Sequence, residues 1–216
     1  MRTIAIIPAR GGSKGIHKKN IALLMGKPLI SYMLDAAKGS KYINEIVVST
    51  DDEEIAKVSI EYGAKIKMRS NEISGDLVSS ECALLDVLKV YNCDILVFLQ
   101  CTAPFTTTED IDGTIKELLH QDADTSLAVT PFHYFLWNKD GEGINHQKSI
   151  RKMRQEREPQ YLEAGSVYVM RTEGFLEHKH RFFGKTVMHI IPNNHVFEID
   201  GHYDLELAEH ILQKKR

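Results

Sequence analysis

The segment IAIIPARGGSKGIHKKN, residues 4–20, joins a short apolar run to a glycine-rich loop with many positive charges. Residues 4–8 are apolar and rich in isoleucine, which favours a strand buried on both faces of a parallel sheet. No Asp or Glu occurs before Asp35, whereas the loop holds these glycines and cations: Arg10, Gly11, Gly12, Lys14, Gly15, Lys18 and Lys19. Ligands of parallel α/β sheets bind beyond the carboxyl ends of the strands, and glycines let backbone N–H groups approach an anion. The loop is therefore predicted to bind a polyphosphate.

Two better-known phosphate loops do not match this segment. A Walker A loop needs Gly-Lys followed directly by Ser or Thr, but here Ser13 precedes Lys14. A dinucleotide loop needs GxGxxG, which the GGSKG of residues 11–15 lacks. A plain turn with solvated lysines is the alternative interpretation, and the clustering of cations favours anion binding over it.

Apolar runs and amphipathic segments alternate along the rest of the chain. Strands are predicted at residues 45–52, 65–69, 94–100, 125–132, 166–170 and 186–191, and helices at 28–38, 53–62, 79–91, 108–120, 172–178 and 203–215. Gly63 suits a helix C-terminal cap, and Thr108 suits the opening of the fourth helix. This alternation predicts an α/β fold with a mostly parallel sheet and helices on both faces.

The alternation stops at residues 133–162, which are polar and lack a clear period. We expect an inserted arm there, within a single domain that spans residues 1–216. A chain of 216 residues is long enough for one well-filled core.

Composition argues against several classes of protein. The formal net charge of −3 disfavours general nucleic-acid binding. No apolar stretch approaches the roughly 18 residues that a membrane span needs, and no secretory signal is recognisable, so a cytoplasmic location away from membranes is expected. Cys82, Cys93 and Cys101 lack CxxC spacing, which favours buried thiols over disulfides or a zinc site.

The opening loop resembles the signature of the cytidylyltransferases that activate nine-carbon keto-sugar acids. These are the CMP-sialic acid synthetases, or N-acylneuraminate cytidylyltransferases, and their bacterial relatives for other nonulosonic acids. Later blocks follow in the family's order at residues 27–37, 46–64, 99–112, 165–176 and 197–212. The resemblance implies a Rossmann-like domain with a small projecting dimerisation arm. It also implies that CTP and the sugar acid react to give the CMP-sugar and pyrophosphate.

The resemblance also assigns roles to residues at matching positions. It implies that Lys19 and Arg10 act in catalysis by stabilising charge during transfer. The implied nucleotide-binding residues are Ala9, Arg10, Gly11, Gly12, Ser13, Lys14, Lys19, Asn20, Arg69, Ser79 and Ser80. The implied sugar-binding residues are Gln100, Arg154, Ala164, Tyr168, Phe182 and Phe183. No His–Asp or Ser–His pairing in the sequence points to a catalytic base.

Mg²⁺ is the cofactor that the resemblance implies, with Glu198 and Asp200 as its ligands. These residues are two apart on an expected strand, so their side chains would share one face and could reach one ion. Relatives usually have Asp-Ile-Asp at this place, and the glutamate carboxylate reaches one methylene further. The chain also departs from the sialic-acid pattern within residues 100–106 and 164–166, on the expected sugar side.

The family passes the aromatic pair Phe182 and Phe183 into the neighbouring subunit, so the resemblance implies a homodimer with shared active sites. Two related functions stay open: activation of the eight-carbon 3-deoxy-manno-octulosonate, and binding of CTP or a CMP-sugar without turnover. A glycosyltransferase is disfavoured, because no DxD motif comes directly after a predicted mid-chain strand.

Overall fold

Strand β1 (Thr3–Pro8) lies inside the sheet, where it pairs in parallel with β4 (Glu45–Thr50) on one side and β6 (Ile95–Leu99) on the other. The apolar residues between its ends are fully buried, as their isoleucine-rich sequence predicts. This computed structural model describes residues 1–214.

The main sheet of the described residues has seven strands in the order β5-β4-β1-β6-β8-β7-β9. The remaining members are β5 (Lys65–Met68), β7 (Thr125–Phe132), β8 (Gln160–Arg171) and β9 (Thr186–Ile190). Strand β8 alone among these seven runs antiparallel to its neighbours, β6 and β7. A separate short hairpin joins β2 (Leu23–Leu24) and β3 (Lys27–Pro28). The prediction of a mostly parallel α/β sheet is confirmed.

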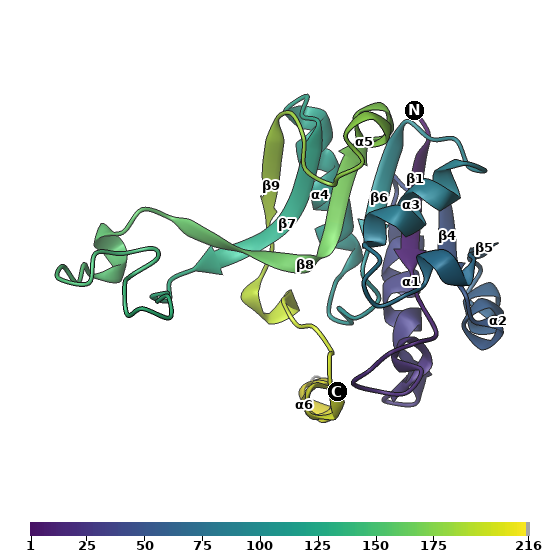
Figure 1. Cartoon of the computed structure of the whole chain (residues 1–216), viewed down its shortest axis with the longest axis horizontal. Helices are drawn as coiled ribbons and strands as arrows, with labels where there is room; N and C mark the ends of the chain where they lie inside the picture. The colour runs from purple at the N-terminus through teal and green to yellow at the C-terminus, as the bar shows by residue number, and fades with distance from the viewer. Residues whose placement is uncertain (215–216) are drawn as a thin grey trace.

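Helices cover both faces of the sheet (Figure 1). Helices α1 (Leu29–Gly39), α2 (Glu53–Glu61) and α4 (Thr108–His120) contribute to one apolar core, and α3 (Ser80–Leu88) and α5 (Thr172–His178) contribute to the core on the other face. Helix α6 (His202–Lys214) packs through Ala208 against Ile16 and Leu24. The sequence places each helix to within a few residues, and the predicted end at residue 215 lies outside the described residues. No helix of residues 1–214 combines the length and apolar character that crossing a bilayer requires.

A twisted ribbon made by β7 and β8 leaves the body of the sheet and carries a projecting arm (Figure 1). The inner half pairs Thr125 with Met170, and the outer half pairs Phe132 with Gln160, with a shift of register between Leu127 and Val129. The arm includes the short 3₁₀ helix η3 (Arg154–Glu156). Strand β8 starts at Gln160, well before the predicted residue 166. The prediction missed the outer part of the strand because its residues are mostly exposed and show no apolar period.

Helix α4 begins with a capping box at Thr107, one residue before the predicted position. The Thr107 hydroxyl accepts from the Asp110 N–H at 3.3 Å, and the Asp110 carboxylate accepts from the Thr107 N–H at 2.9 Å. The Asp110 carboxylate also lies 2.8 Å from Nδ1 of His195, in the 3₁₀ helix η4 (Asn193–His195). The start of α4 therefore anchors the segment that leads towards Asp200.

The cap predicts a measurable cost for Thr107→Ala. The substitution removes an acceptor for a helix N–H, so the free energy of unfolding should fall by about 1 kcal/mol. Urea denaturation followed by circular dichroism measures this as a lower midpoint with an unchanged slope. An unchanged midpoint would mean that the box does not stabilise α4.

Candidate functional site

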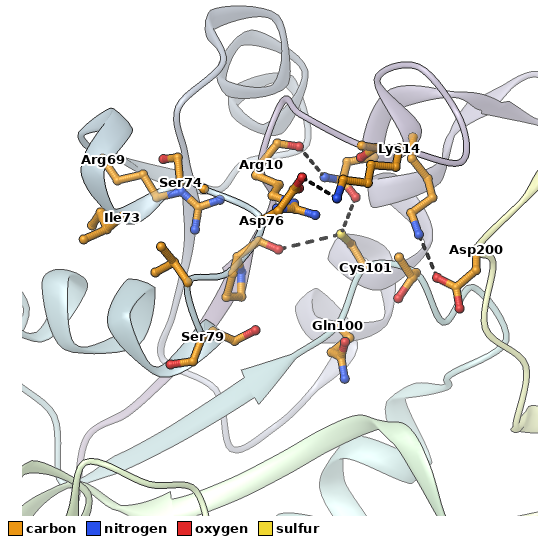
Figure 2. Close-up of a pocket in the computed structure, with 18 of the residues that line it drawn as sticks. Arg10, Lys14, Arg69, Ile73, Ser74, Asp76, Ser79, Gln100, Cys101 and Asp200 are labelled. Atoms are coloured by element: carbon orange, nitrogen blue, oxygen red, sulfur yellow. Dashed lines mark hydrogen bonds and ion pairs between the residues drawn. The ribbon is translucent and has the colours of Figure 1, made fainter.

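A cavity of about 520 Å³ opens at the carboxyl ends of β1, β5 and β6 (Figure 2). The segment after β1 contributes Arg10, Ser13, Lys14, Gly15, Lys19 and Asn20. The segment between β5 and α3 contributes Arg69, Ile73, Ser74, Gly75, Asp76, Val78, Ser79 and Ser80, the last of which opens α3. Pro8, Phe98, Gln100, Cys101, Thr102 and Asp200 complete the lining. This edge is where parallel α/β sheets bind ligands.

Two cations of the opening loop share one carboxylate across the cavity. Arg10 Nη1 lies 2.6 Å from Oδ1 of Asp76, and Lys14 Nζ lies 2.8 Å from its Oδ2. Figure 2 shows Asp76 between the two cations. Lys14, and then Arg10, hold the pKa of the Asp76 carboxyl below its usual range, so this group stays ionised near neutral pH. An anion that enters the cavity must compete with Asp76 for both cations.

Lys19 joins the opening loop to the C-terminal segment. Its Nζ donates to the Ile199 carbonyl at 2.8 Å and lies 2.9 Å from Oδ1 of Asp200, and its side chain is only 15% exposed. A Cβ atom at Gly15 would come within 2.1 Å of the Asp200 carbonyl oxygen. Glycine is therefore required where the two segments meet.

Lys18 is the one lysine of the opening loop that turns away from the cavity. It has a left-handed backbone with φ of 48° and pairs with Glu54 at 2.5 Å and Asp52 at 3.7 Å. The sequence has no carboxylate near these cations, yet the fold supplies one to each from a distant segment. The cationic loop is thus charge-compensated before any ligand binds.

Arg69 presents a buried guanidinium at the cavity wall. Its side chain is 5% exposed, and burial lowers the pKa of the guanidinium, although Asp51 lies 3.9 Å away. Its Nε is buried and has no hydrogen-bond partner among the described residues. A buried donor of this kind suits a ligand oxygen, because leaving it unpaired is costly.

The structure brings most of the predicted nucleotide-binding residues to the cavity. Those that line it are Arg10, Ser13, Lys14, Lys19, Asn20, Arg69, Ser79 and Ser80. Ala9, Gly11 and Gly12 do not line it. Ala9 is fully buried, and the Gly11 N–H donates to Oδ1 of Asp51 at 2.9 Å.

Of the predicted sugar-binding residues, Gln100 lines the cavity. A second hollow of about 420 Å³ shares Ser79 with it and includes Phe182 and Glu163. The buried Tyr168 stacks on Phe98 with ring centroids 5.3 Å apart and donates its hydroxyl to Glu163. Burial, together with this carboxylate, raises the pKa of the Tyr168 hydroxyl.

The other predicted sugar-side residues lie outside both cavities. Ala164 is buried in β8, and Phe183 stacks on His178. Arg154 is exposed in the arm and lines a separate hollow with Phe132. Within one chain, Arg154 therefore does not reach the cavity that the opening loop lines.

Arg181 is a residue of the second hollow that sequence reasoning missed. Its Nε donates to Glu81 at 2.7 Å, and its guanidinium carbon lies 4.8 Å and 4.7 Å from the ring centroids of Phe98 and Tyr168. Its position directly before Phe182 is the signal that could have found it. The sequence analysis also did not identify Asp76 and Cys101 as site residues. The only sequence feature that indicates them is that each follows a predicted strand.

Glu198 and Asp200 do not lie on a strand, contrary to the expectation from sequence. Their segment is extended, and its Ile199 N–H donates to the Thr102 carbonyl at 2.9 Å without a strand partner. The Thr102 hydroxyl donates to Glu198 at 3.3 Å, and Asp200 alone of the two lines the cavity. Burial and the charge of Asp200 raise the pKa of the Glu198 carboxyl. A buried carboxylate whose charge is disfavoured in this way fits a divalent cation, because the cation relieves the repulsion.

A protein-family model described as cytidylyltransferase matches residues 4–215. The chain belongs to the cytidylyltransferase family. The pseudaminic acid cytidylyltransferase of Campylobacter jejuni is 32% identical, over 99% of this chain and 97% of that protein. The N-acylneuraminate cytidylyltransferase of Escherichia coli is 31% identical, over 100% of this chain and 54% of that protein. The family that the opening loop indicates is confirmed, and the chain is a nucleotidyltransferase.

The fold of this cytidylyltransferase is also found in a solved structure of CMP:2-keto-3-deoxy-manno-octonic acid synthetase complexed with CTP. The two chains superpose with a TM-score of 0.77 and cover each other completely, at 16% sequence identity. At that identity the likeness concerns the fold.

The shared carboxylate predicts that Asp76→Asn tightens anion binding by this cytidylyltransferase. The amide is neutral and similar in shape, so Arg10 and Lys14 become available, and inorganic tripolyphosphate should bind with a several-fold lower Kd in calorimetry. The gain should shrink as salt is added.

Asp122→Asn is the matched control for this measurement. It makes the same charge change at an ion pair with Arg171, at 2.6 Å and outside the cavity. Equal Kd values for the two variants would show that Asp76 does not compete with anions.

Proposed function

We propose that this cytidylyltransferase transfers the cytidylyl group of CTP to a nonulosonic acid, a nine-carbon α-keto acid sugar, and releases pyrophosphate. The observation that carries the proposal is the convergence of Arg10, Lys14 and Lys19 on one cavity whose far side holds Gln100. Relatives aligned over almost the whole chain are named for pseudaminic acid and N-acylneuraminate.

The triphosphate occupies the cationic side of the cavity in this proposal. Arg10 and Lys14 exchange Asp76 for phosphate oxygens, which bring more negative charge than one carboxylate. Lys19 is held at the junction with Asp200, so its ammonium group is placed before the ligand arrives. Such preorganised charge lowers a barrier more than charge that must be reoriented.

The nucleoside lies against the segment between β5 and α3. The buried Nε of Arg69 offers a donor for a carbonyl oxygen of the base, and the hydroxyls of Ser79 and Ser80 line the same wall. One buried donor beside neutral hydroxyls suits a base carbonyl better than it suits a phosphate, which carries more charge.

The sugar acid lies towards Gln100 and the second hollow. Arg181 provides positive charge there, and Phe182 provides apolar surface for the substituents of the sugar. In this proposal Arg154 reaches the sugar from the partner subunit's arm, since the arm projects away from the body of the sheet (Figure 1) and Arg154 does not line its own chain's cavity.

The reaction is an in-line displacement at phosphorus. The anomeric hydroxyl oxygen of the sugar forms a bond to the α-phosphorus, and the bond from that phosphorus to the bridging oxygen breaks. The electron pair leaves with pyrophosphate, and the hydroxyl proton passes to water. Lys19 and Arg10 stabilise the negative charge that grows on the bridging oxygen.

We propose Mg²⁺ as the cofactor, held by Asp200 and Glu198. No group of three or more His, Cys, Asp or Glu side chains within residues 1–214 could hold a metal ion. A two-carboxylate site completed by water and substrate phosphates is the arrangement that Mg²⁺ prefers. When bound, the ion would neutralise phosphate charge.

We also propose that the chain forms a homodimer through its arm. The arm exposes large apolar side chains, among them Tyr134 at 65%, Ile144 at 63% and Met153 at 71% exposure. Apolar surface gathered on a projecting segment is typical of an interaction site. A second copy of the chain fits this surface, since Arg154 does not line the cavity of the opening loop in its own chain.

The activity is tested by mixing the protein with CTP, Mg²⁺ and each of a panel of nonulosonic acids. We expect a product with the mass of the CMP-sugar together with pyrophosphate. Turnover of the eight-carbon 3-deoxy-manno-octulosonate alone would favour that cytidylyltransferase instead, and CTP binding without product would favour a non-catalytic relative. Lys19→Ala should lower kcat/KM by about a hundredfold.

Lys18→Ala is the matched control for Lys19→Ala. Lys18 is the adjacent lysine, but it pairs with Glu54 and does not line the cavity. It should keep kcat/KM close to that of the unmodified protein. Equal losses in the two variants would contradict the role of Lys19.

The dimer is tested by sedimentation of the unmodified protein, which should have twice the mass of one chain. Ile144→Asp places a charge on the apolar arm and should weaken dimerisation by at least about tenfold. Ile60→Asp changes a residue of similar exposure, 60%, on α2 and should leave the dimer intact. A monomeric unmodified protein would contradict this proposal.

A further inference from the structure

The buried Asn20 ties together the two ends of the opening loop. It lies in the 3₁₀ helix η1 (Lys19–Ile21) and is 5% exposed. Its Nδ2 donates to the backbone carbonyl of Arg10 at 2.8 Å. Because Arg10 begins the loop and Asn20 ends it, this bond sets the spacing between the cations at the two ends.

Cys101 holds the other side of the Asn20 carboxamide. It lies two residues after the end of β6 and is 3% exposed, and its Sγ lies 3.1 Å from Asn20 Oδ1 but 4.0 Å from the Pro8 carbonyl oxygen. Figure 2 shows dashed lines from the Cys101 sulfur to these two oxygen atoms. Between these two acceptors, the shorter distance identifies the Asn20 oxygen as the one that takes the thiol proton.

The direction of these bonds requires a protonated thiol. Asn20 uses its NH₂ group on Arg10, so it can only accept at Oδ1, and the sulfur must donate. Complete burial raises the pKa of the Cys101 thiol to about 12, even though Lys19 and Arg69 oppose this shift. The thiol therefore remains a donor throughout the physiological pH range.

Loss of this donor would leave the carboxamide held by one bond alone, to the Arg10 carbonyl, with its buried Oδ1 unpaired. The two ends of a carboxamide have nearly the same shape, so packing alone does not choose between them. In the reversed orientation Oδ1 would face the Arg10 carbonyl oxygen, and the bond that joins the loop ends would be replaced by repulsion between two acceptors.

We propose that Cys101 is a positioning residue, whose thiol orients Asn20 so that the opening loop holds Arg10 and Lys19 ready for the triphosphate. The inference rests on the proposed function, since it assumes that the loop binds the triphosphate of CTP. In this proposal Cys101 acts through its bond to Asn20.

Calorimetric titration with CTP, without sugar acid, tests the proposal. Cys101→Ala removes the donor and should weaken CTP binding about fivefold, the effect expected for one lost hydrogen bond. Cys101→Ser restores a donor and should return the Kd to within about twofold of the unmodified value. Equal affinities for the unmodified protein and Cys101→Ala would overturn the proposal. No CTP binding by the unmodified protein would instead overturn the proposed function.

Cys93→Ala is the matched control. Cys93 is a partly buried thiol whose partner is the hydroxyl of Thr172 at 3.2 Å, and it lies outside the cavity. It should leave CTP affinity unchanged even if thermal stability falls. If Cys101 had only a structural role, Cys101→Ala would also lower the thermal stability of the protein but would leave CTP affinity unchanged. That result would contradict the proposal that Cys101 positions Asn20.

A double-mutant cycle separates action through Asn20 from other effects. If Cys101 acts through Asn20, adding Cys101→Ala to Asn20→Ala should weaken CTP binding no further. Additive losses would overturn the proposal.

The infrared S–H stretch provides a test that does not depend on a variant's binding. The band assigned to Cys101, by subtraction of the Cys101→Ala spectrum, should lie at the position of a hydrogen-bonded thiol. If Cys101→Ala does not fold, Cys101→Ser serves for the subtraction. A band at the position of a free thiol would contradict the proposal.

Discussion

The approach of Gly15 to the Asp200 carbonyl oxygen is the contact on which the cavity depends. Any side chain at residue 15 would collide with this oxygen, so at this position the two segments meet through their backbones. The meeting lets Lys19 donate to the Ile199 carbonyl and bind the Asp200 carboxylate. The site is therefore built where the first loop of the sheet closes against a segment almost two hundred residues later in the chain.

The free cavity holds its cations in ion pairs rather than exposing bare positive charge. Asp76 pairs with Arg10 and Lys14, and Asp200 pairs with Lys19. By pairing with the cations, these carboxylates allow them to lie close together, because the negative charge offsets the repulsion between the cations. Anion binding then becomes an exchange of partners, in which the incoming group must offer more charge or better geometry than a carboxylate.

Most of the fold could be predicted from the sequence because each element carries its own local signal. The isoleucine-rich β1 and the acidic, amphipathic start of α2 are recognised without knowledge of their partners. Asp76 could not be recognised, since an exposed aspartate in a turn looks the same whether or not two cations face it. Cys101 looked like an ordinary buried thiol, because its significance lies in the orientation of Asn20. The strand expected at residues 198–200 failed for a related reason: alternating residues resemble a strand even where no neighbouring strand is available.

The shift of register between Leu127 and Val129 divides one pair of strands into two parts with different environments. As far as Val129, β7 also pairs with β9 and belongs to the buried sheet, and beyond Thr130 it forms with β8 a ribbon that ends in the arm. A bulge increases the local twist, so the ribbon leaves the plane of the sheet. Insertions or deletions beyond Phe132 can therefore lengthen, shorten or reshape the arm while the pairing of Thr125 with Met170 stays the same. The arm can therefore change in evolution without a change in the cavity at the carboxyl ends of β1 and β6.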